Sequence, residues 1–361
     1  MRTHMLRFGA LALLSYALLY YGYKFHDPAL VGGGDFALYA PMYLSPLDAS
    51  AAPHPFVTRQ LHAVVTHLIH TLAPTYDTLT AVPEATRRLL FAALLSNYLG
   101  LLVAATGACA SFEHLTRDVP GARASALPLL VGCTCLLAFS APVSVLTGGA
   151  EGWSWALMSL GFLSYVSGRT GATLAILAAC VFQREVALLA LAALAAPDAL
   201  LRARTQEVRR HARRVLLGAS CAACAYVALR LGVGQAAYGH QLSPGAYLTR
   251  WLTPSGWLDA SFVFQALLSQ NTLALYLLAL GARLHHTPPP RDVRGVLTER
   301  FGLAHLGGAW LLVFLVCVGA GIGNNTGRVT AMFTPVWASM AGLQLWHVYR
   351  AGRAPSGRDD A

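Results

Sequence analysis

Asp35 follows three consecutive glycines, 32–34, soon after the first long apolar segment of the chain. Glycine permits backbone angles that other residues avoid, and it lets the main chain approach a ligand closely. A carboxylate that is shielded from bulk water can accept the proton of a hydroxyl group, as a general base does. Asp35 is therefore a candidate catalytic base. The simpler alternative is an ordinary aspartate in a glycine-rich turn.

Arg59 follows Pro53 and Pro55 and precedes a short apolar segment, 61–72. This segment is too short to cross a bilayer, so we predict a helix that lies along the membrane surface. The Arg59 guanidinium could bind a phosphate through two parallel hydrogen bonds. An arginine that merely extends its charged end from the membrane interface into water is an equally good interpretation.

The same short segment carries three histidines, His62, His67 and His70. His67 and His70 would share one face of a helix, as two metal ligands might. Because no acidic residue stands at ligand spacing, we predict that these histidines are polar residues of the interface and that there is no metal site.

Arg184 and Glu185 interrupt the long apolar run 170–197. Ionisable groups at membrane depth are costly, and they mark functional sites more often than chance. Successive residues of a helix point about 100° apart, so Arg184 and Glu185 cannot pair with each other on one helix. We predict a turn near the membrane surface, with both side chains facing a cavity; the alternative is a structural ion pair between helices.

A glycine-rich loop, 321–327, precedes Arg328 and the last apolar segment. If Arg328 begins a helix, the backbone N–H groups and the helix dipole there also favour an anion. Asn325 lies in the same loop and could add a contact. Asn-Asn-Thr-Gly is equally the sequence of an ordinary turn.

The composition of the chain indicates the kind of fold that holds these candidate residues in place. Of the 361 residues, 56% are hydrophobic and 12% are charged, against roughly 25% charged in a typical soluble protein. Apolar segments near the ~20 residues of a membrane helix recur along the chain. We predict an all-α fold, a polytopic transmembrane helical bundle of about ten spans. The net charge of +10 falls mainly in short loops, as topology requires, so we expect no nucleic-acid partner.

The expected spans have boundaries uncertain by a few residues, and 170–197 could be one span or two. Splitting it keeps the basic run 202–214 on the same side as the other basic loops. The spans are 8–23, 88–110, 124–147, 153–168, 170–183, 185–197, 214–233, 262–282, 303–320 and 329–348.

The loop charges also predict an orientation. Most of the 26 lysines and arginines fall in loops that share one side if both termini are cytoplasmic. Residues 1–350 then form a single transmembrane domain, followed by a short cytoplasmic tail, 351–361. The outer side carries two long loops, 24–87 and 234–261, in which we expect helices that lie along the surface.

The arrangement resembles the GT-C superfamily of membrane glycosyltransferases. Members have a catalytic acidic residue in the first outer loop, and many bacterial ones have a Pro-Phe-x-x-Arg element after it. A broken helix and an arginine that opens a late, proline-containing span are also familiar. The matching residues here are Asp35 with Phe36 and Tyr39, Pro55 and Phe56 with Arg59, Gln183 to Glu185, and Arg328 with Pro335.

The resemblance implies transfer of a sugar from a polyprenyl-phosphate-linked donor to an extracytoplasmic glycan, lipid or protein acceptor, at the bacterial inner membrane. It makes Asp35 the general base and implies inversion at the sugar. Substrate would be bound by Tyr39, Arg59, Arg184, Glu185, Asn325 and Arg328. The second acidic residue found beside the base in other members is missing, so a divalent metal is doubtful, and no other cofactor is expected.

Two other classes of function fit the same composition. A transporter or flippase would place its site near the middle of the membrane, often at broken helices between repeats. An inactive membrane assembly partner would need no convergence of the acid with the arginines. Whether Asp35, Arg59, Glu185 and Arg328 line one cavity is the feature that separates these interpretations.

Overall fold

A computed structural model gives the positions of most residues of the chain. The described residues are 2–24, 35–48, 51, 59–72, 84–117, 121–122, 125–138, 141–142, 150–200, 205–232, 269–286, 303–319 and 329–353. All regular structure in these ranges is helical, which confirms the all-α class for this part of the chain.

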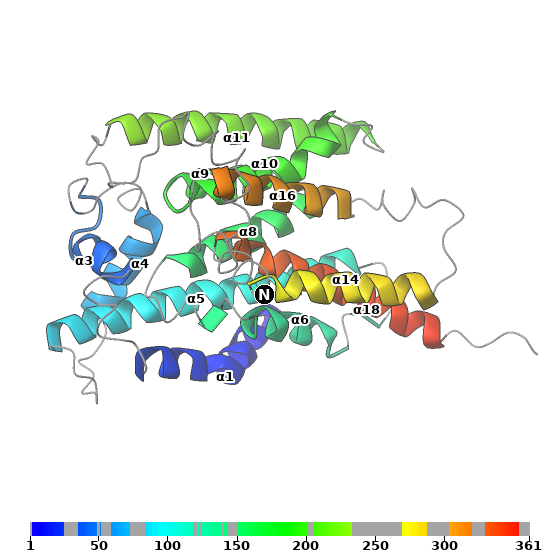
Figure 1. Cartoon of the computed structure of the whole chain (residues 1–361), viewed down its shortest axis with the longest axis horizontal. Helices are drawn as coiled ribbons and strands as arrows, with labels where there is room; N and C mark the ends of the chain where they lie inside the picture. Colours follow the sequence, from blue (N-terminus) through cyan, green and yellow to red (C-terminus); the bar gives the residue numbers. More distant parts are fainter. Residues whose placement is uncertain are drawn as a thin grey trace, which may run out of the picture.

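The helices follow one another as in Figure 1. Their bounds are α1 Arg2–Lys24, α3 Asp35–Leu44, α4 Gln60–Leu72, α5 Glu84–Leu115, α6 Leu127–Leu136, α8 Glu151–Val166, α9 Thr170–Val181, α10 Glu185–Leu200, α11 Gln206–Gly232, α14 Asn271–His286, α16 Leu303–Gly319, the 3₁₀ helix η4 Ala331–Phe333 and α18 Thr334–Arg353.

Among the residues that the structure describes, three helices are long and apolar enough to cross a membrane, over Thr3–Gly22, Thr86–Leu115 and Gln206–Leu229. Large apolar side chains remain exposed on α1, where Leu13 is 77% exposed and Leu14 65%. Such exposure is costly in water and favourable against lipid. The predicted split of 170–197 is also seen, because α9 ends at Val181 and α10 begins at Glu185.

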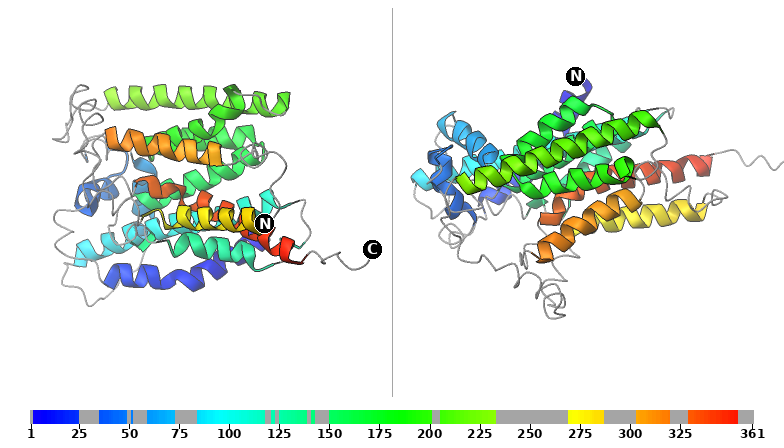
Figure 2. Two further views of the ribbon diagram at one scale, coloured as in Figure 1. Left: turned by 45° about the vertical axis from the view of Figure 1, so that its right-hand side comes forward. Right: turned by 90° about the horizontal axis from the view of Figure 1, so that it is seen from above.

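The short helices α3 and α4 lie together at one end of the bundle, at the left of Figure 1 and of both views in Figure 2. We call this the α4 end. The predicted helix after Arg59 is α4, and it packs against α3 and α5. Asp35, which belongs to the predicted outer loop 24–87, is the first residue of the helix α3. The loop 234–261 lies outside the described residues.

The central helix α5 contacts α1, α4, α6, α8 and α18. Its contact with α8 depends on glycine. A Cβ atom on Gly100 would lie 2.5 Å from the backbone carbonyl carbon of Gly152, and one on Gly152 would lie 2.0 Å from the carbonyl oxygen of Asn97. Small residues let helix backbones approach in this way. The Gly152 N–H then donates to the Asn97 side-chain oxygen at 2.5 Å, which fixes where α8 begins.

Candidate functional site

Arg59 and Tyr39 meet at the α4 end. Arg59 is the residue before α4 and is only 8% exposed, while Tyr39, from α3, is fully buried. The Arg59 Nη1 group donates a hydrogen bond to the Tyr39 hydroxyl. The guanidinium carbon also lies 5.8 Å from the centre of the Tyr39 ring, within range of a cation–π interaction. Two of the predicted binding residues are therefore in direct contact.

The charge on Arg59 is kept by its neighbours despite burial. Burial by itself lowers the pKa of the guanidinium, but Tyr39, Glu185 and Glu151 together raise it above its ordinary value. Arg59 is therefore a permanently charged group in a largely dehydrated place. Glu185, another predicted residue, is close enough to contribute to this balance.

Arg184 pairs with a carboxylate that the sequence analysis missed. Its Nη1 atom lies 3.4 Å from Oε1 of Glu151, and the two side chains are 8% and 1% exposed. Glu151 is the first residue of α8, where the helix dipole favours a negative charge. The sequence does contain a signal for Glu151: glycines 148 and 149 precede it much as glycines 32–34 precede Asp35.

The break between α9 and α10 holds these elements together. The Leu61 N–H donates to the Phe182 carbonyl at 3.0 Å, and the His62 N–H donates to the Gln183 side-chain oxygen at 3.1 Å. Gln183 Nε2 in turn donates to the Ala150 carbonyl at 2.6 Å, just before α8. The first N–H groups of a helix have no partner within it. Here the broken helix supplies those partners for α4.

His62 joins α4 to α3 and α5 at this site, and through Ser96 to α8. Its Nε2 atom lies 3.0 Å from the Tyr43 hydroxyl, and its Nδ1 atom 3.2 Å from the Ser96 hydroxyl. Ser96 also accepts a hydrogen bond from the Trp153 ring at 3.1 Å. The sequence placed His62 among interfacial polar residues, whereas the structure buries it completely. The interpretation failed because a histidine with satisfied partners needs no solvent.

We expect His62 to make stability depend on pH. Burial lowers its pKa from 6.5 to about 4, and the positive charge of Arg59 acts in the same direction, partly opposed by Glu151. Between these pH values the unfolded chain binds a proton that the folded chain does not. Stability should therefore be constant above pH 6.5 and fall by up to ~3 kcal/mol as the pH drops to 4.

The measurement is unfolding in detergent micelles from pH 8 to 4, for the wild type, His62→Gln and His285→Gln. The exposed His285 serves as the matched control. His62→Gln should lose part of the acid sensitivity, and His285→Gln should keep it. A His62→Gln variant with the wild-type pH dependence would contradict the buried neutral histidine.

Four of the seven predicted site residues are thus gathered at the α4 end: Tyr39, Arg59, Arg184 and Glu185. The side chain of Asp35 lies outside the described part of the structure, as do Asn325 and Arg328. No group of three histidine, cysteine, aspartate or glutamate side chains that could hold a metal occurs among the described residues.

No protein family, characterised protein or solved structure matches this chain. The functional proposal therefore depends on the residues and their geometry.

Proposed function

We propose that the protein is a membrane glycosyltransferase that moves a sugar from a polyprenyl-phosphate donor to an extracytoplasmic acceptor. One observation carries the proposal: two buried arginines, Arg59 and Arg184, lie in the same region as the carboxylates Glu151 and Glu185 at one end of an apolar helical bundle, and Arg184 pairs with Glu151. Fixed positive groups in a site with little water stabilise a developing negative charge strongly. The departing polyprenyl phosphate would develop such a charge.

The orientation that suits this chemistry puts the α4 end outside, in a bacterial inner membrane crossed about ten times. The distribution of arginines supports it. As expected of cytoplasmic helix ends, the opposite end of the bundle carries several arginines: Arg7, Arg117, Arg169 and those near the start of α11. Both termini would then be cytoplasmic.

In the proposed reaction, the Asp35 carboxylate takes the proton of an acceptor hydroxyl. The acceptor oxygen forms a bond to the anomeric carbon of the donor sugar while the bond from that carbon to the phosphate oxygen breaks. The polyprenyl phosphate leaves with the electron pair, stabilised by Arg59, Arg184 and Arg328. A single displacement inverts the anomeric configuration. Tyr39 holds the Arg59 guanidinium, and Glu185 and Asn325 would contact the sugar.

The position of Asp35 is compatible with this role. It stands four residues before Tyr39 in α3, and positions four apart lie on the same face of a helix. The acid therefore begins the helix whose later residue binds Arg59.

A transporter or flippase is the second candidate, and the break at Gln183 between α9 and α10 is the observation that favours it. Broken helices with charged residues form the substrate sites of many transporters. Here the break is occupied by hydrogen bonds to α4 and α8, which support a fixed site better than a moving one.

One experiment separates the two functions. The full chain is placed in proteoliposomes with a set of radiolabelled polyprenyl-phosphate sugars and an acceptor mixture from the cell envelope. A glycosyltransferase releases polyprenyl phosphate and gives a labelled acceptor with inverted configuration. Movement of intact donor between leaflets, without cleavage of the sugar–phosphate bond, would overturn the proposal in favour of a flippase.

A further inference from the structure

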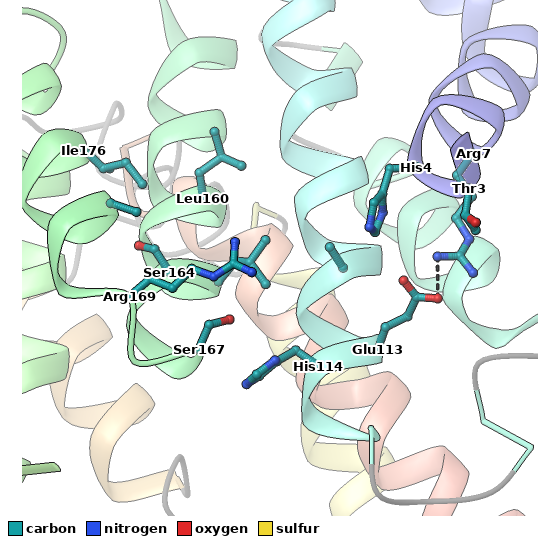
Figure 3. A pocket seen from close by; sticks show the side chains of 13 residues that line it. Thr3, His4, Arg7, Glu113, His114, Leu160, Ser164, Ser167, Arg169 and Ile176 are labelled. Atoms are coloured by element: carbon teal, nitrogen blue, oxygen red, sulfur yellow. Dashed lines mark ion pairs between the residues drawn. The ribbon is translucent and has the colours of Figure 1, made fainter. Parts of the chain in front are cut away.

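A polar cavity lies at the end of the bundle opposite the α4 end. It has a volume of about 660 Å³ and is lined by residues of α1, α5, α8 and α9 (Figure 3). All four helices begin or end there, at Arg2, Leu115, Val166 and Thr170. If the bundle spans a bilayer, helix ends lie at the depth of the lipid headgroups. The cavity would therefore open at headgroup level.

One side of the cavity is neutral. Arg7 and Glu113 form an ion pair of 2.5 Å, drawn as a dashed line in Figure 3. The charges of these two residues balance, so they form a wall and leave no excess charge for a ligand.

The other side is positive. Arg169 extends from the start of α9 into the space between α8 and α5, near His114 (Figure 3). The Arg169 side chain is exposed and pairs with no carboxylate among the described residues. His114 donates from Nε2 to the Val166 carbonyl at 3.2 Å, which fixes the ring in the cavity wall. The start of α9 has no side-chain cap, so its dipole also favours an anion.

Part of the remaining lining is apolar. Leu160 and Leu163 of α8 and Ile176 of α9 continue the cavity wall along the helices. Beside it, Met5 and Leu6 on α1 are each 67% exposed, as expected of side chains that face lipid. A positive pocket at a helix end that continues into an apolar surface matches a molecule with a phosphate and acyl chains.

We propose that this cavity binds one anionic phospholipid, with its phosphate against Arg169 at the start of α9 and its acyl chains along Leu160, Leu163 and Ile176. The inference does not rest on the proposed sugar transfer, because the cavity lies at the other end of the bundle. It assigns a specific lipid partner to a defined surface.

The test is native mass spectrometry of the delipidated full chain, titrated with phosphatidylglycerol, phosphatidylcholine or inorganic phosphate. The wild type should retain one phosphatidylglycerol in preference to phosphatidylcholine. Arg169→Gln should weaken that binding about fivefold, because one arginine near a lipid surface contributes ~1 kcal/mol. Arg169→Lys should keep most of the affinity.

Arg213→Gln is the matched control, because Arg213 is another exposed arginine in the first half of α11, outside the cavity. It should change the affinity less than twofold. Ala172→Trp gives a second, steric test, since Ala172 lines the cavity and is exposed. The proposal is overturned if Arg169→Gln and Ala172→Trp both bind phosphatidylglycerol as the wild type does, or if inorganic phosphate displaces the lipid.

Discussion

Asp35→Asn should lower the rate of sugar transfer by ~10²–10⁴-fold, which is the usual contribution of a general base. Asparagine has nearly the same shape as aspartate but cannot accept the acceptor proton. Binding of the donor should change little, because the phosphate is held by the arginines. The measurements are kcat for transfer and the Kd of the donor, obtained separately with the purified full chain.

Asp48→Asn is the matched control for this variant. Asp48 lies just after α3 and is exposed. The same chemical change, from carboxylate to amide, is therefore made nearby in the sequence at a residue that is not part of the proposed site. Its kcat should stay within about twofold of the wild type. Equal rates for Asp35→Asn and the wild type would remove the base from the proposed mechanism, whereas loss of donor binding alone would make Asp35 a binding residue.

Much of the site could be predicted from sequence because charge is rare in this chain. In a segment as apolar as 170–197, Arg184 and Glu185 are conspicuous, and the cost of burying them demands partners. The same reasoning indicated Arg59 before a segment too short to span. These residues lie close together in the structure.

The partners themselves could not be predicted in this way. Glu151 stands at the start of α8, and its role depends on Arg184, a residue 33 positions later. That proximity depends on the packing of the start of α8 against the α9–α10 break, where Gln183 donates to the Ala150 carbonyl, and no local pattern reveals it. His62 was misjudged for a related reason, since its partners Tyr43 and Ser96 come from two other helices.

Glu151→Gln should destabilise the fold by ~3–5 kcal/mol, because it removes the carboxylate that lies 3.4 Å from the buried Arg184 guanidinium. Arg59 would also lose one of the carboxylates that keep it charged. Replacing both members of the pair, with Glu151→Gln and Arg184→Met, should cost less than the sum of the two single changes. The measurement is reversible unfolding in mixed micelles, analysed as a double-mutant cycle.

Glu113→Gln is the control that shows whether the burial of an ion pair or the distance between its charges determines the loss of stability. The Arg7–Glu113 pair is shorter, 2.5 Å against 3.4 Å, yet its side chains are 15% and 14% exposed at the opposite end of the bundle. If the distance between the charges determined the loss of stability, Glu113→Gln would destabilise the fold more than Glu151→Gln. We expect it to cost less than Glu151→Gln, because both side chains are partly exposed beside a cavity, where water can replace part of the lost interaction. A loss of only ~1 kcal/mol for Glu151→Gln itself would mean that the site at the α4 end is hydrated. The strong electrostatic stabilisation proposed for the leaving phosphate would then have no dry environment to act in.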